Sequence, residues 1–362
     1  MQTLRAIDAD THVDETDDTW AYVPAAEEAL KPTTGFPRNP RPDLPPARYW
    51  VVDGHRKERK LRDDGKSRTT VETRELLDVE ARLRHMDELE VEVQVLYPTL
   101  FLVEPAVRPE AELTITRSYN RWLAERCALS HGRLRWVCVP PARNMDLALE
   151  ELRFAKDHGA CGVLKKGDRE ADKWPADPYF FPLYEEAERL DLPLCFHTGT
   201  GTPDFTSSFD VGPGFMRGKG AVINGVFSLV QRNIPAKFPG LRFGFVEAGA
   251  SWVPMVDYSI RRNAQRFDQS SAGGFRTRPE VEDDIFKANR FYVTCQVDED
   301  LPMILRYIGE DNLLIGSDYT HQDSSQELGF LRNLQARAER AEIPESAVRK
   351  IAYDNPKAFY GL

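Results

Sequence analysis

The sequence lacks the features that mark disulfide-bonded, membrane-spanning and secreted proteins. Its five cysteines are scattered and include no Cys-x-x-Cys pair, which excludes a zinc ribbon and argues against a disulfide scaffold. No apolar run approaches the roughly 18 residues of a membrane helix. The first residues have no apolar core of the kind found in a signal peptide, so the sequence predicts a cytoplasmic protein with no membrane partner.

The chain also has no surplus of positive charge. It contains 48 Lys and Arg residues against 58 Asp and Glu residues, which gives a formal net charge of -10. Phosphate backbones are bound by basic surfaces, so the composition argues against a nucleic-acid partner and leaves a small-molecule substrate. No Gly-x-Gly-x-x-Gly follows the first apolar segment, which disfavours a doubly wound nucleotide-binding sheet.

What the chain does contain is a regular alternation of two patterns. Eight short apolar segments, bounded by Pro, Gly or Asp, have the character of buried parallel strands. Amphipathic segments of helical period follow most of them. The alternation predicts an α/β fold of the (β/α)8 TIM-barrel type. The predicted strands cover residues 4–10, 91–97, 134–139, 161–165, 192–197, 241–247, 291–295 and 313–318, and the predicted helices cover residues 73–90, 110–130, 145–158, 182–190, 220–233, 301–308, 326–339 and 345–359.

One connection is far longer than the others. About eighty residues separate the first two predicted strands, whereas βα loops usually have about 2–6. We interpret residues 1–362 as a single domain, and residues 31–72 as an insertion within it that forms a lid or a homodimer contact. A disordered linker is the alternative, but the apolar stretch 49–52 indicates a short strand.

The end of the first predicted strand carries candidate metal ligands. Asp10 and His12 stand at positions i and i+2, so both side chains point to the same face of the strand. Glu15 follows on the next loop and would reach a second ion or a bound water. Three other predicted strands end in similar residues, which are His197, Glu247 and Asp318, with His321 three residues further on. Ligands at the carboxyl ends of several strands are typical of a barrel active site.

Five motifs of the chain resemble those of a known family. The motifs at residues 7–12, 196–199, 245–254, 316–319 and 355–361 are similar to those of the amidohydrolase-related branch of the amidohydrolase superfamily. That branch contains aminocarboxymuconate semialdehyde decarboxylase together with related decarboxylases and hydrolases. The resemblance covers nearly the whole chain and implies a metal-dependent barrel enzyme.

The chain departs from the family pattern at two ligand positions. Asp10 and Glu247 stand where histidines are more common in the family. Because the replacements add buried negative charge, we expect two divalent ions, with iron, manganese and zinc all compatible with these ligands. Glu247 could instead act as an acid or base beside a single ion. This variant resembles the metal-dependent acyl-CoA thioesterases of platensimycin and platencin biosynthesis.

The expected reaction is hydrolysis of a carboxylic acid derivative. A metal-activated water would attack the carbonyl of a thioester, ester, lactone or amide, and Asp318 would carry the proton, as the resemblance implies. His321 would be a ligand or would stabilise the transition state. The alternative is non-oxidative decarboxylation of an aromatic or enoic acid, and a non-enzymatic scaffold is a third hypothesis.

Four residues are candidates for substrate binding. Lys165 ends the fourth predicted strand, where it would anchor the substrate or, as in some superfamily members, bridge two metal ions. Trp252 would form an apolar wall with Phe215, and Arg217 would bind an anionic group.

Overall fold

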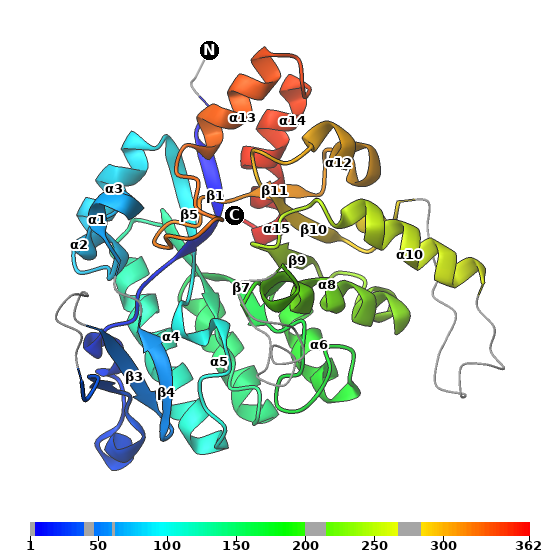
Figure 1. Ribbon diagram of the computed structural model, residues 1–362. Coiled ribbons are helices and arrows are strands. Elements are labelled where there is room, and N and C mark those ends of the chain that lie inside the picture. Colours follow the sequence, from blue (N-terminus) through cyan, green and yellow to red (C-terminus); the bar gives the residue numbers. More distant parts are fainter. Residues whose placement is uncertain (1–3, 40–46, 60–61, 200–214, 267–283) are drawn as a thin grey trace.

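The computed structural model describes residues 4–39, 47–59, 62–199, 215–266 and 284–362, except for the side chains of residues 215–217. Eight parallel strands form one sheet at the centre of the molecule, and helices surround it (Figure 1). Neighbours in the sheet follow the chain in the order β1 (Ala6–His12), β5 (Val91–Tyr97), β6 (Leu134–Cys138), β7 (Ala160–Lys165), β8 (Leu194–His197), β9 (Phe243–Val246), β10 (Phe291–Cys295) and β11 (Leu313–Ile315).

The sheet curls so that its last strand returns to its first. The Asp318 backbone N–H donates to the carbonyl of Asp10 at 2.9 Å, and the His12 N–H donates to the carbonyl of Tyr319 at the same distance. Gly316 is required at this contact, because a Cβ there would lie 2.3 Å from the Cβ of Asp10. This closure confirms the predicted (β/α)8 barrel.

Most of the helices correspond to amphipathic segments of the sequence, but the sequence predicted no helix at residues 234–237, 253–265 or 285–288. They are α3 (Val79–Glu88), α4 (Pro109–Ala128), α5 (Met145–Asp157), α6 (Phe181–Arg189), α8 (Phe215–Gln231), α9 (Ile234–Lys237), α10 (Val253–Gln265), α11 (Ile285–Ala288), α12 (Leu301–Ile308), α13 (Phe330–Glu339), α14 (Glu345–Arg349) and α15 (Asn355–Tyr360). Residues 345–359 were expected to form one helix, but a π-helical segment, Lys350–Asp354, separates α14 from α15. Pro356 in the first turn of α15 has no N–H to continue the helical hydrogen bonding, which explains the interruption.

The long connection after β1 is folded in its described parts. Strands β2 (Thr33–Gly35), β3 (Arg48–Val52) and β4 (His55–Arg59) form a separate antiparallel sheet at one side of the barrel (Figure 1). Two short helices, α1 (Asp64–Ser67) and α2 (Val71–Arg74), return the chain toward the barrel. Trp50 of β3 is buried and packs edge-on against Trp20, with ring centroids 5.6 Å apart. The described helices include none with the length and apolarity of a membrane span.

The contact between the two tryptophans yields a prediction about stability. Trp50→Ala should lower the free energy of unfolding by about 3–5 kcal/mol, because it leaves a cavity where the insertion meets the barrel. Trp174→Ala is the matched control, because Trp174 is 48% exposed, and it should change stability by only about 0.5 kcal/mol. Urea denaturation and the rate of trypsin cleavage within residues 31–72 measure the effect. Equal behaviour of the two variants would contradict this packing.

Candidate metal centre

The end of β1 places two ligand side chains inside the barrel mouth. Asp10 and His12 are both buried and lie on the same face of the strand. The carbonyl of Pro98 lies 2.9 Å from Nδ1 of His12 and accepts its proton, which leaves Nε2 as the nitrogen with a lone pair. His197, at the end of β8, has Nε2 3.1 Å from Oδ1 of Asp10 and 3.3 Å from Oε2 of Glu247.

Two further carboxylates follow β9 and β11 in an unusual backbone conformation. Glu247 has φ 58° and Asp318 has φ 49°, in the left-handed region that side chains with a Cβ enter at a cost of roughly 1–2 kcal/mol. The Glu247 N–H donates to Oγ1 of Thr294 at 2.7 Å. These turns bring both carboxylates toward His12, whose Nε2 lies 3.8 Å from Glu247 and 3.4 Å from Asp318.

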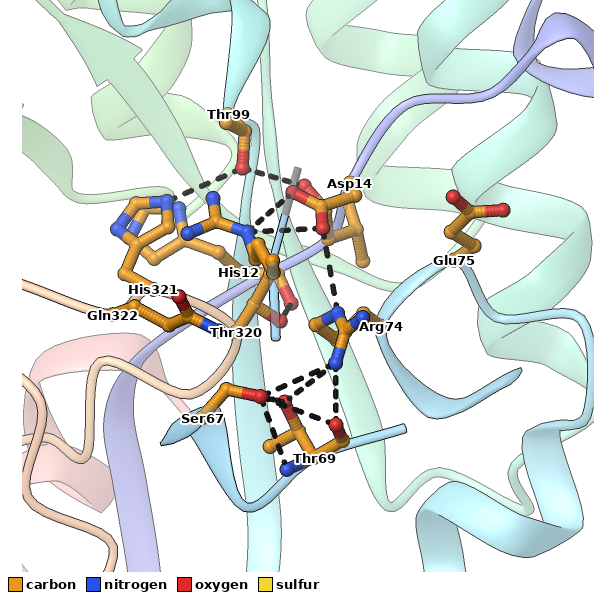
Figure 2. A network of polar contacts seen from close by, with 12 residues as sticks. His12, Asp14, Ser67, Thr69, Arg74, Glu75, Thr99, Thr320, His321 and Gln322 are labelled. Atoms are coloured by element: carbon orange, nitrogen blue, oxygen red, sulfur yellow. Dashed lines mark hydrogen bonds and ion pairs between the residues drawn. The ribbon is translucent and has the colours of Figure 1, made fainter. Parts of the chain in front are cut away.

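His321 completes the centre from the loop after β11. Its ring stacks on that of His12 with centroids 3.8 Å apart, and its Nδ1 lies 2.8 Å from Oδ1 of Asp318. Thr99 lies on the other side of the ring, with Oγ1 3.3 Å from Nε2 (Figure 2). His321 therefore joins Asp318 to the loop that follows β5.

Six predicted residues thus form two overlapping clusters. Asp10, His12, His197 and Glu247 make one, and His12, Glu247, Asp318 and His321 make the other; within each, the possible ligand atoms lie within 4.8 Å of one another. The two clusters share His12 and Glu247. Sequence spacing alone could not reveal this sharing, because it depends on how the barrel closes.

The charges in the centre favour a bound cation. Burial, followed by repulsion from Glu247 and Asp10, raises the pKa of Asp318 well above its usual range. Burial also raises the pKa of Glu247 to about 8, with Asp10 adding to the rise and His197 opposing it. Although burial works against it, the Asp10 carboxylate raises the pKa of His197 to about 9.

Several atoms of the centre have no hydrogen-bond partner among the described residues. They include Nε2 of His12, Oε2 of Glu247 and Oδ2 of Asp318, all of them buried. Buried polar atoms without partners are costly, and the donor set of imidazole nitrogens and carboxylate oxygens suits iron, manganese or zinc. These residues therefore fit a divalent metal ion.

A buried network behind the centre was missed by the sequence analysis. The carboxylate of Asp8 accepts hydrogen bonds from the N–H and the hydroxyl of Ser317, the residue before Asp318. Gln94 donates to Asp8 at 3.2 Å and accepts from Nε of Arg82 at 2.7 Å. Asp8 has the same i, i+2 relation to Asp10 that Asp10 has to His12. This spacing was the feature of the sequence that could have identified Asp8.

The structure does not bring Glu15 or Lys165 to the centre. Glu15 belongs to neither cluster, because its two carboxylate oxygens accept hydrogen bonds from the N–H groups of Thr99 and Leu100, each at 2.9 Å. Lys165 is fully buried and is paired with Glu170, and its ammonium lies 3.5 Å from the centroid of the Phe180 ring. Glu15 is therefore not placed to bind a second ion, and Lys165 is not placed to anchor a substrate at the centre.

The other predicted substrate contacts also differ from expectation. Trp252 is buried, donates from Nε1 to the carbonyl of Gly249, and packs against the ring of Phe245, so it belongs to the core and not to a substrate wall. Phe215 and Arg217 stand in the first turns of α8, and their side chains lie outside the described residues.

Known proteins resemble this chain in sequence. The family model described as Amidohydrolase matches residues 7–362. A gamma-resorcylate decarboxylase from Rhodococcus jostii (strain RHA1) is 32% identical over 132 residues, which cover 34% of this chain and 40% of that enzyme. The chain thus spans less than half the length of the curated relatives it matches.

Solved structures share the fold at low sequence identity. An amidohydrolase from Mycobacterium avium subsp. paratuberculosis K-10 is 19% identical with a TM-score of 0.78, and the match covers 100% of this chain and 99% of that one. A dihydroxybenzoic acid decarboxylase from Polaromonas sp. JS666, solved with manganese and the inhibitor 2-nitroresorcinol, is 19% identical with a TM-score of 0.67, covering 99% and 98%. At these identities the likeness shows the barrel fold alone.

These relatives correct the expected reaction. Hydrolysis of a thioester, ester, lactone or amide was the leading expectation, with a likeness to acyl-CoA thioesterases. The curated relatives that match are decarboxylases, in agreement with the alternative reaction, and the thioesterase likeness finds no support. These relatives therefore give no support for reading Asp10 and Glu247 as signs of a hydrolase.

Metal binding should be visible as thermal stabilisation. Adding Mn²⁺ at about a hundred times its Kd to chelator-treated protein should raise Tm by about 5 °C, because the ion offsets repulsion among the buried carboxylates. His197→Ala should lose most of this shift. The exposed His55 provides the control, because His55→Ala should keep it. Differential scanning calorimetry measures the shift in Tm. If Mn²⁺ raised the Tm of both variants equally, the ion would bind elsewhere.

Proposed function

This chain belongs to the amidohydrolase family, and from that premise we propose that it is a metal-dependent, non-oxidative decarboxylase of an aromatic acid. The observation that carries the proposal is the similarity to gamma-resorcylate decarboxylases over part of the chain. The buried centre supports it, because it combines ligands for a cation with a paired acid at Asp318 and His321.

We propose one metal ion in place of the two expected from the sequence. The two clusters share His12, whose Nδ1 is occupied by the carbonyl of Pro98. Its single remaining lone pair, on Nε2, binds one ion only. Asp10, His12, His197 and Glu247 would hold that ion, and manganese is the metal bound by the Polaromonas decarboxylase. When bound, the ion would supply positive charge to hold the substrate carboxylate.

The pair formed by Asp318 and His321 is positioned to hold the proton that the reaction consumes. The hydroxyl of Thr99 donates to the carbonyl of Val13 at 2.7 Å, so its oxygen accepts from Nε2–H of His321. One proton is then shared between Nδ1 of His321 and Oδ1 of Asp318. The carbon–carboxylate bond breaks, CO₂ leaves, its bonding electrons stay on the ring carbon, and that carbon takes the proton.

The environment of this pair favours proton transfer over exchange with solvent. Asp318 and His321 are only 2% and 4% exposed. Below the centre, Tyr97 and Tyr360 are buried and joined through their hydroxyls at 2.7 Å, which closes the barrel interior beneath His197. A dry site of this kind strengthens charge interactions with an anionic substrate.

The partners and location predicted from the sequence remain predictions. The acyl compound expected as substrate is replaced in this proposal by an aromatic carboxylic acid. A cytoplasmic location stays a prediction. A measurement of molecular mass in solution would test the homodimer. Deletion of residues 31–72 would test whether the insertion is a lid or a subunit contact.

The reaction is tested with gamma-resorcylate and other hydroxybenzoates. Manganese-loaded protein should release CO₂ from at least one of them, and Asp318→Asn should slow this release by about a hundredfold or more while metal content stays unchanged. His55→Ala should keep full activity. The measurement is CO₂ release together with elemental analysis of each variant. If no acid in the panel is decarboxylated faster than by chelator-treated protein, the proposal fails.

A further inference from the structure

We propose that Glu15 is a positioning residue for the paired acid. It acts through Thr99 to keep a proton on Nε2 of His321, so that Nδ1 of that ring stays directed at Asp318. The inference rests on the proposed function and deepens it, because this pair is the one that holds the proton for decarboxylation. In this role Glu15 touches neither the metal ion nor the substrate.

The contacts of the His321 ring give its two nitrogens different roles. Nδ1 lies 2.8 Å from Oδ1 of Asp318, and Nε2 lies 3.3 Å from Oγ1 of Thr99 (Figure 2). The Thr99 hydroxyl donates its only proton to the carbonyl of Val13 at 2.7 Å, so its oxygen can only accept a proton from Nε2. In a histidine, the hydrogen bond of one nitrogen sets the role of the other. Thr99 thus presents Nδ1 to the carboxyl group.

The carboxylate of Glu15 holds the backbone of Thr99 in place. Its Oε1 accepts from the N–H of Thr99 and its Oε2 accepts from the N–H of Leu100, each at 2.9 Å. Thr99 precedes a short 3₁₀ turn, Leu100–Leu102, and N–H groups at the start of a helical turn have no partner within it. Because one side chain binds two successive peptide groups, the place of the Thr99 hydroxyl follows from that of Glu15.

Glu15 is buried with these N–H groups as its partners and without a countercharge. It is only 4% exposed, and no Lys or Arg side chain of the described chain forms an ion pair with it. A buried charge without an opposite charge is unfavourable. The arrangement is understandable if both N–H groups must be held at once, because only Asp and Glu carry two acceptor oxygens on one side chain.

The insertion after β1 limits the access of water to this carboxylate. A cavity of about 20 Å³ beside Glu15 is lined in part by Thr99 and Leu100, and by Trp50 and Arg59 of the insertion. A space of this size holds about one water molecule. Hydrogen bonds in such a dry environment are stronger than in water. The fold of the insertion thereby supports the geometry of the paired acid.

The protonation of the His321 ring tests the inference without turnover. The chain has seven histidines, so ¹⁵N NMR of their side chains in zinc-loaded protein can be assigned by comparison with His321→Asn. Spectra are recorded at pH 8, because burial raises the pKa of Glu15 to about 7. Nε2 of His321 should carry a proton in the wild type and in Thr99→Ser. It should lose that proton in a measurable share of Thr99→Val molecules, because valine has no acceptor.

Glu15→Gln should cause the same loss, because its amide group turns a donor toward one of the two N–H groups. If Glu15→Gln does not fold, Glu15→Asp takes its place, because the shorter side chain cannot reach both N–H groups. Glu151→Gln is the matched control. Glu151 is a fully buried carboxylate on α5 that accepts from Asn120 and Arg121, and its loss should leave the His321 signals unchanged.

Three outcomes of the NMR experiment would overturn the inference. The first is an Nε2 of His321 without a proton in the wild type. The second is a set of His321 signals that stays unchanged in both Thr99→Val and Glu15→Gln. The third is a change in Thr99→Val alone, which would remove the role of Glu15.

Kinetics separate this inference from the proposed function. Thr99→Val and Glu15→Gln should lower kcat for CO₂ release about tenfold or more with KM unchanged, and Thr99→Ser should keep most of the kcat. A loss of kcat as large in Glu151→Gln would contradict the positioning role. If the His321 proton depends on Glu15 and Thr99 in a protein that releases CO₂ from no acid, the positioning stands and the proposed decarboxylation is refuted.

Discussion

The concentration of buried negative charge at the mouth of the barrel is the constraint on which the rest of the site depends. Asp10, Glu247 and Asp318 lie around His12, and no Lys or Arg side chain of the described residues forms an ion pair with any of them. Such an arrangement is unfavourable in a low dielectric unless a cation neutralises it. The strained turns at Glu247 and Asp318 bring their carboxylates toward His12. The contact with Pro98 fixes the orientation of the His12 ring, so that Nε2 faces these carboxylates.

Closure of the barrel is what makes this gathering possible. The first and last strands approach so closely that only glycine fits at position 316, and Asp8 fastens the backbone of Ser317 directly before Asp318. The proton-holding pair is thus positioned by the same contacts that close the sheet. A change that loosens the seam between β1 and β11 would disturb stability and chemistry together.

Much of this was predictable from the sequence because the strands are apolar runs that end in polar residues. All eight strands were found near their expected positions, and six of the expected site residues come together. The predictions differed from the structure where a side chain had a local partner that sequence patterns do not reveal. Glu15 accepts hydrogen bonds from backbone N–H groups, Lys165 pairs with Glu170, and Trp252 packs in the core.

The order in which the residues occur along the chain has a consequence for biogenesis. The centre joins Asp10 and His12, near the start, to Asp318 and His321, more than three hundred residues later. During synthesis the early ligands leave the ribosome long before the late ones exist, so a nascent chain offers only fragments of the coordination sphere. An ion that requires both ends of the chain would therefore bind only after β11 has docked on β1, so the metal available to the finished barrel would decide which ion is acquired.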